Sequence, residues 1–219
     1  MKIGAIITGD IVDSTKLSLV ERKIMLNAID SVPEILSGYD ISIEIFRGDS
    51  FQMRVNQVKD SLKIALIIRA YLRSHKLESP KTILDARIAI GIGAIEYESE
   101  TLSKSDGEAY RLSGRLLDAM RKARLEITTP WQHVNSELSL TTAFADDIAS
   151  SWTPNQSEIM LLSLLSSKSH LEISQELGIS RQMVDKSLKS SKKELIYAYI
   201  KRFEELITIH IKENDCHID

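Results

Sequence analysis

Two aspartates lie in short motifs that could hold a divalent cation. Asp10 follows a short apolar run at residues 2–8, and Asp49 lies in the segment Arg47-Gly48-Asp49-Ser50, between two stretches of β-forming residues. A strand that ends beside a hairpin could bring the two carboxylates together, and Mg²⁺ and Mn²⁺ prefer oxygen ligands. Ions held there could activate a hydroxyl and neutralise a triphosphate. The sequence therefore predicts Asp10 and Asp49 as ligands of Mg²⁺ or Mn²⁺.

A third residue could serve the same chemistry. Arg115 lies in a predicted helix at 107–123, and a guanidinium that faces the same edge would stabilise charge during phosphoryl transfer. Each residue also has a simpler interpretation. Asp10 could cap a turn, Asp49 could belong to an ordinary hairpin turn, and Arg115 could pair with an acid on its own helix. Both interpretations stay open from the residues alone.

A basic helix near the C-terminal end could bind DNA. Gly178-Ile179-Ser180 forms a predicted turn, because glycine accepts a left-handed cap and serine caps the following helix. The helix after the turn is rich in lysine, so it could contact phosphates, and its first residues could reach base edges. The predicted DNA-contacting residues are Ser180, Arg181, Gln182, Lys186, Lys189 and Lys192. A helical bundle with a solvated lysine face, or a similar unit kept only for dimerisation, is the alternative.

Apolar periodicity divides the chain into a mixed part and a helical part. We expect strands at 2–8, 41–46, 51–55, 85–97 and 125–128, and helices at 17–36, 60–75 and 107–123. This order predicts an α+β fold, a ferredoxin-like sheet with helices on one face, followed by an all-α unit. The expected parts are 1–130, a connecting helix at 131–152, and 153–219. The last part ends in a long amphipathic helix, which favours a homodimer.

The composition is that of a folded protein of ordinary size. The chain has 219 residues and a net charge of −3, so any DNA contact must come from a local basic patch. The single cysteine, Cys216, cannot form an internal disulfide. No signal-peptide pattern and no apolar run of the ~20 residues that cross a bilayer is present. We therefore expect a cytoplasmic protein that does not associate with membranes.

Three segments in the first 128 residues resemble class III nucleotide cyclases. They are GDIVDST at 9–15, FRGDSF at 46–51 and GEAYRLSGRL at 107–116. The resemblance implies that Asp10 and Asp49 hold metal ions and that Arg115 steadies the reacting phosphates. It also implies a nucleotide site. The nucleotide-contacting residues that it implies are Ile11, Ser14, Thr15 and Arg111, the last at the position of the family's ribose-contacting asparagine.

The chain departs from the cyclase pattern where the family recognises the base. The position of the base-recognising lysine is Ile45, and that of its partner acid is Lys104. The usual glycine of the first motif is Asp13. The sequence thus favours a regulator over an active enzyme.

Residues 153–193 resemble the helix-turn-helix of sigma-factor region four and of LuxR-type regulators, and the whole arrangement resembles the SatD family of small bacterial proteins. The predicted function is a transcription regulator that binds double-stranded DNA, with a first part that senses a nucleotide or a metal. The alternative is a metal-dependent nucleotidyl cyclase or another enzyme that processes nucleoside triphosphates. A helical module that binds protein is a third interpretation.

Overall fold

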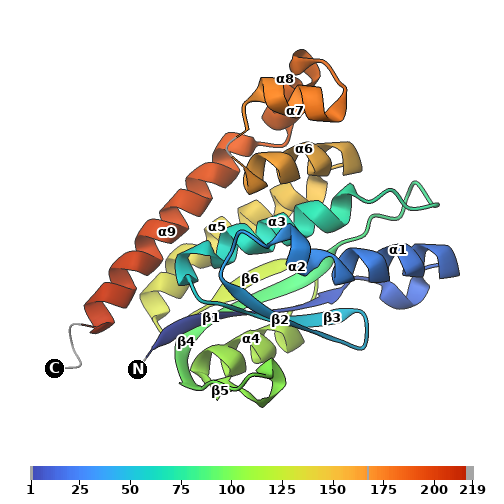
Figure 1. Cartoon of the computed structure of the whole chain (residues 1–219). Helices are drawn as coiled ribbons and strands as arrows, with labels where there is room; N and C mark the ends of the chain where they lie inside the picture. Colours follow the sequence, from blue (N-terminus) through green and yellow to red (C-terminus); the bar gives the residue numbers. More distant parts are fainter. Residues whose placement is uncertain (1, 167, 216–219) are drawn as a thin grey trace.

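The computed structural model describes residues 2–166 and 168–215, and it combines a mainly antiparallel sheet with helices on both faces (Figure 1). Cys216 lies outside the described residues. The α+β class predicted from the sequence is confirmed. The strands are β1 (Ile3–Ile11), β2 (Ile41–Phe46), β3 (Ser50–Val55), β4 (Ala86–Tyr97), β5 (Asp106–Gly107) and β6 (Leu125–Thr128). The short strand β5 has no counterpart in the sequence prediction.

The sheet has the order β2-β3-β1-β4-β5, and all of these neighbours are antiparallel. β6 adds a parallel pairing beside the first half of β4. The helices of the first part are α1 (Leu19–Asp30), α2 (Val32–Ile35), α3 (Ser61–Ser74) and α4 (Glu108–Ala119). The single helix expected at 17–36 is in fact two, since Ser31 lies between α1 and α2 as the C-cap of the first and the N-cap of the second.

Helices cover both faces of the sheet, so the prediction of helices on one face is wrong. Side chains of β1 alternate: Ile7 joins the main core on the α3 side, whereas Ile6 packs with Tyr110 of α4 in a separate cluster. Gly91 of β4 allows this second layer, because a Cβ there would collide with the backbone of α4 at Ala109 and Ser113. The α4 backbone can therefore lie directly on the strand.

The remainder of the chain is helical. It comprises α5 (Gln132–Ser151), α6 (Pro154–Leu165), α7 (His170–Leu177), α8 (Arg181–Ser190) and α9 (Lys193–Asp215). α6 packs on α3, and one continuous apolar cluster runs from the sheet through α3 to α6, α8 and α9, with Trp152 fully buried inside it. α7 and α8 lie at the end of the molecule farthest from the sheet (Figure 1). The division at residues 130 and 152 stays a prediction.

None of the helices in the described part of the chain is both long and apolar enough to cross a membrane.

Candidate functional site

Asp10 and Asp49 lie at the same end of the sheet, where β1 ends and the β2–β3 hairpin turns. Asp10 pairs with Ser50 in the strand register. The backbone N–H of Ile11 donates to the carbonyl oxygen of Asp49 at 2.8 Å. The hairpin turn takes positive φ values at Arg47 and Gly48, 53° and 78°, which places Asp49 at the start of the returning strand. The fold thus brings the two predicted metal ligands to neighbouring positions of the backbone.

Asp10 is paired with a guanidinium that the sequence prediction does not single out. Arg87 of β4 lies directly across from Asp10. Its Nε donates to Oδ1 at 2.9 Å, its Nη2 donates to Oδ2 at short range, and its Nη1 donates to the carbonyl oxygen of Met120. Donation to the Asp10 carboxylate raises the pKa of Arg87. The one available signal was an arginine within a run, residues 86–95, otherwise composed of alanine, isoleucine and glycine.

Asp49 is bound by hydroxyl groups rather than by a cation. The Ser14 hydroxyl donates to Oδ2 at 2.8 Å, and the Ser50 hydroxyl makes a longer contact of 3.4 Å with Oδ1. Ser14 begins the short 3-10 helix Ser14–Lys16, in which Thr15 is exposed. Three residues of the predicted nucleotide site, Ile11, Ser14 and Thr15, therefore surround the end of β1.

The donor set at this end of the sheet does not fit a metal ion as the side chains are arranged. Within residues 2–166 and 168–215, no group of three or more His, Cys, Asp or Glu could hold one. One of the two carboxylates, Asp10, already has both oxygens bound by Arg87. A divalent cation at Asp10 would have to displace this guanidinium.

Arg111, another predicted residue, is bound toward the opposite end of β4. Arg111 of α4 binds Glu96 with an Nη2–Oε1 distance of 2.5 Å and Asp106 with an Nη1–Oδ1 distance of 3.0 Å. Glu96 lies along β4 from Arg87, and at about 3.3 Å per residue the separation is about 30 Å. Arg111 and Asp10 therefore do not meet within one chain.

Arg115 is exposed on α4, and its side chain has no ion pair or hydrogen bond to any described residue. The alternative interpretation, a pair within its own helix, is thus not what the structure contains. No contact with the described part of the chain therefore fixes the direction of this guanidinium.

The helices and the turn at 170–190 lie where the sequence places them. Ser169 and Glu172 form a capping box at the start of α7, and Gly178 ends this helix with a φ of 64°. The Ser180 hydroxyl accepts a hydrogen bond from the backbone N–H of Met183 at 3.2 Å and so caps α8. Two apolar side chains, Val184 and Leu188, hold α8 in the core.

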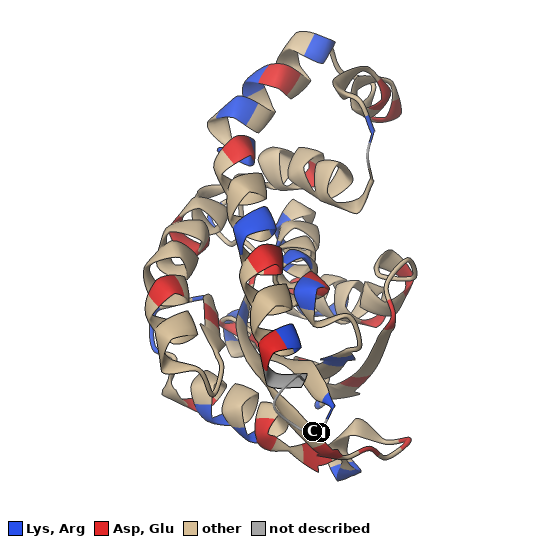
Figure 2. Cartoon of the chain, turned by 90° about the vertical axis from the view of Figure 1, so that its left-hand side faces the viewer, with Lys and Arg blue, Asp and Glu red and all other residues tan. Residues whose placement is uncertain are grey.

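The opposite face of α8 is polar. Its exposed predicted residues are Arg181, Gln182, Lys186 and Lys189. Asp185 reduces the positive charge locally, since it contacts the imidazole Nδ1 of His170 and lies 4.0 Å from the Arg181 guanidinium. Lys192 is exposed between α8 and α9 with a φ of 57°. Figure 2 shows basic and acidic residues mixed along these helices, so positive charge is local to short stretches.

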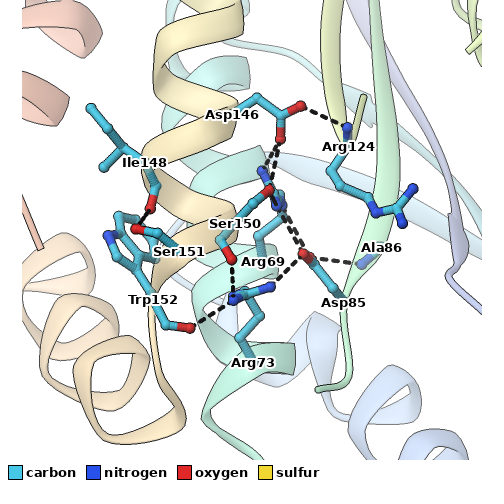
Figure 3. A network of polar contacts seen from close by, with 10 residues as sticks. All are labelled: Arg69, Arg73, Asp85, Ala86, Arg124, Asp146, Ile148, Ser150, Ser151 and Trp152. Carbon is cyan, nitrogen blue, oxygen red and sulfur yellow. Dashed lines mark hydrogen bonds and ion pairs between the residues drawn. The ribbon is translucent and has the colours of Figure 1, made fainter. Parts of the chain in front are cut away.

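A buried ionic network joins the sheet to the later helices (Figure 3). Arg69 of α3 donates to Asp85 just before β4 at 3.0 and 2.8 Å, and to Asp146 of α5 at 2.7 Å. Arg73, one turn further on, donates to Asp85 at 2.8 Å and to the carbonyl oxygen of Trp152 at 2.6 Å. All these groups lie in or near the core, so the pairs are shielded from solvent.

The charges of the network set the pKa of Asp85. Burial alone would raise it, but the nearby Arg69 charge and its hydrogen bonds, together with Arg73, hold the pKa of Asp85 below its usual value. The network also extends to α8: the Trp152 indole N–H donates to the carbonyl oxygen of Ser191 at 3.0 Å, where α8 ends. Helix α3 is thus connected through Trp152 to the end of α8.

No family model matches the chain, and no curated protein matches it either. Solved structures with a similar fold include an adenylate/guanylate cyclase/hydrolase from Silicibacter pomeroyi, which is 19% identical over 64% of this chain and 80% of that chain, with a TM-score of 0.47. The active GGEEF domain of a diguanylate cyclase from Vibrio cholerae is 12% identical over 60% of this chain and 85% of that chain, with a TM-score of 0.43. A bacterial light-regulated adenylyl cyclase is 21% identical over 57% and 75%, with a TM-score of 0.42.

The described residues form an α+β fold with a helical extension.

Proposed function

We propose that this chain is a transcription regulator that binds double-stranded DNA through α8. The observation that carries the proposal is the pair α7 and α8, joined by the turn at 178–180 and placed at one end of the molecule (Figure 1). A helix supported in this way can enter the major groove with its first residues toward the base edges. The exposed first turn of α8 contains Arg181 and Gln182, side chains that pair well with guanine and adenine.

The remaining exposed cations of α8 suit the DNA backbone. Lys186 and Lys189 lie further along the helix, and Lys192 follows its end. Lysines in such positions bind phosphates and fix the orientation of the protein on the duplex. Because the chain has a net charge of −3, attraction to DNA must come from this local set, and affinity should fall steeply with salt.

The proposal includes a homodimer in the cytoplasm, since two copies of α8 could read two half-sites of an operator. The long helix α9 would be free to pair along its exposed side, which includes Leu195 and Ile209.

The test is selection of binding sequences from random duplexes by the full chain, followed by fluorescence anisotropy on a selected duplex at several salt concentrations. The triple variant Arg181→Ala, Gln182→Ala, Lys186→Ala should bind at least about tenfold more weakly. The matched control is Arg22→Ala, Lys23→Ala on α1, where both side chains are exposed. Failure to enrich any sequence, or equal affinity of the triple variant, would refute DNA binding by α8.

A second candidate function is processing of a nucleoside triphosphate at the end of β1. The observation in its favour is the adjacency of Asp10 and Asp49, with Ser14 beside them. In one chain the Arg111 guanidinium is bound to Glu96 and Asp106, toward the other end of β4 from Asp10, so this candidate needs a second copy to complete a site. The test is release of pyrophosphate from ATP or GTP with Mn²⁺, with Asp49→Asn as the control. No release from either nucleotide would eliminate it.

A further inference from the structure

We infer that a pocket beside the end of β1, on the side of α3 and α5, binds a small molecule that carries a phosphate monoester. The pocket has a volume of about 420 Å³. Its walls come from the loop after β1, the segment before β4, the residue before β6, and the ends of α3 and α5. A concave site of this size matches those that hold small metabolites.

The pocket has more positive than negative charge. Its lining includes four cationic side chains, Lys16, Arg73, Lys81 and Arg124, and two acids, Asp13 and Asp85. Both acids are already paired. Asp13 binds Lys16 at 2.8 Å, and Asp85 lies between the buried guanidinium groups of Arg69 and Arg73.

Two of the cations are in no ion pair, although Arg124 helps Lys16 to lower the pKa of Asp13. The side chains of Lys81 and Arg124 make no hydrogen bond or ion pair with any residue in the described ranges, although the Arg124 backbone N–H donates to Asp146 at 2.8 Å. In Figure 3 the Arg124 guanidinium points away from the buried network. Arg73 retains donor capacity as well, because its Nε is buried without a hydrogen-bond partner in the described structure.

This charge pattern selects the chemistry of the ligand. The lining has two positive charges in excess, and a phosphate monoester carries roughly −1.5 to −2 at neutral pH. A guanidinium can donate two parallel hydrogen bonds to phosphate oxygens, as Arg124 is free to do. Leu17 and Ile83 supply apolar surface on the same pocket for the organic part of the molecule.

The pocket lies on the opposite face of the sheet from the Asp10 side chain. Thr8 of β1 bonds to Ser113 of α4, and Asp10, two residues further along the strand, points to the same face. Arg73 and Asp85 belong to the network on the opposite face, between α3 and α5. A ligand here would be a second site, independent of both DNA binding and the chemistry considered for Asp10 and Asp49.

The experiment is calorimetric titration of the full chain with glucose 6-phosphate, with inorganic phosphate and with glucose. We compare the wild type with Lys81→Ala, Arg124→Ala and with the control Arg22→Ala, Lys23→Ala, which removes the same charges from α1. The wild type and the control should bind glucose 6-phosphate, glucose should not bind, and the pocket variant should be weaker by at least about tenfold.

Two further measurements keep the result decisive. Circular dichroism and the melting temperature of the pocket variant establish that it is folded, and the single variant Lys81→Ala, at an exposed position, replaces it if it is not. Weaker binding of inorganic phosphate than of the ester supports a contribution from the apolar wall. Absence of glucose 6-phosphate binding, equal binding by the pocket variant, or tighter binding of inorganic phosphate than of the ester would overturn the inference. None of these outcomes depends on whether the chain binds DNA.

Discussion

Arg87 donates hydrogen bonds to both carboxylate oxygens of Asp10 from the directly opposing position of the neighbouring strand. Both side chains are about three-tenths exposed, at 30% and 27%, so the pair lies at the rim of the sheet rather than in its core. In this structure the Arg87 guanidinium thus occupies the side of Asp10 where the sequence predicts a divalent cation.

Replacing Arg87 should release Asp10 as a ligand. In Arg87→Gln we expect Mn²⁺ to bind about tenfold more tightly than in the wild type, because the carboxylate no longer has a competing positive charge. Binding is measured by the loss of the free Mn²⁺ electron paramagnetic resonance signal. The double variant Arg87→Gln, Asp10→Asn should not show this tighter binding of Mn²⁺. Equal Mn²⁺ affinity in Arg87→Gln and the wild type would show that Asp10 is not a ligand.

Asp85 should be among the most sensitive positions for stability. Asp85→Asn removes the carboxylate that pairs with Arg73 and leaves Asp146 as the remaining acid beside Arg69, so the network has two buried guanidinium groups and one carboxylate. Breaking a buried pair in this way costs about 3–5 kcal/mol. The loss is measured as the change in the free energy of unfolding in urea. The control Asp13→Asn removes an exposed partner of Lys16 and should change stability by no more than about 0.5 kcal/mol. A loss at Asp85 no larger than at Asp13 would contradict this account.

The Asp85 carboxylate should also make the free energy of unfolding depend on pH, with lower stability in acid. The pKa of Asp85 is below its ordinary value of 3.8 in the folded chain, because Arg69 and Arg73 stabilise the charged form. The contribution of Asp85 to the free energy of unfolding is therefore fully present above the pKa of the unfolded state. It is lost as the pH falls below 3.8 and through the lower pKa of the folded state. In urea titrations, the difference in the free energy of unfolding between the wild type and Asp85→Asn should become smaller in that acidic range. A difference that stays constant there would contradict the linkage.

Tyr199 should make the stability of the folded chain depend on pH in the alkaline range. Burial raises the pKa of Tyr199 from 10.0 to about 12, and its hydroxyl hydrogen-bonds Thr142 at 2.5 Å. The pKa of Tyr199 is higher in the folded than in the unfolded state. The neutral phenol therefore contributes fully to the free energy of unfolding below pH 10, and this contribution is lost as the pH rises toward 12. In spectrophotometric titration, Tyr199→Phe should remove a late-ionising phenol. If the variant removes a phenol that ionises near pH 10, the burial argument fails.

Substitution of Gly178 should destabilise the chain because of the backbone conformation alone. A Cβ at this position would meet nothing within 4 Å, but the φ of 64° is unfavourable for a branched side chain. Gly178→Val should therefore lower the free energy of unfolding by about 1–2 kcal/mol, and Gly178→Asn by less. Gly38→Ala is the matched control, since Gly38 also has open space and lies outside the positive-φ positions. Equal effects at the two glycines would contradict the explanation.

The sequence predicts the local elements well, because they depend on local signals. The Gly178 cap and the Ser180 N-cap mark the turn before α8, and both are where expected. The hairpin between β2 and β3 is found for the same reason. The position of α4 on the second face is not readable from periodicity, since it follows from the close approach that Gly91 allows.

The sites are predicted less well than the elements because they depend on register and on long-range pairing. The partner of Asp10 is a residue far along the chain, and only the pairing of β1 with β4 places Arg87 opposite it. Arg69 and Arg73 are one turn apart on α3, a spacing typical of a solvated face, yet both are buried by α5 and its end. Arg111, assigned by resemblance, lies at the other end of β4 because α4 begins there.

The continuous apolar cluster has a consequence for how this chain could have been assembled from older parts. A helical tail joined by an exposed linker can be exchanged between unrelated partners by recombination, with little adjustment on either side. Here α6 covers α3, and Trp152 is buried where the two halves meet. Ancestors of this chain that swapped the tail would have exposed the outer surface of α3 to water, so the two halves are expected to have been inherited together.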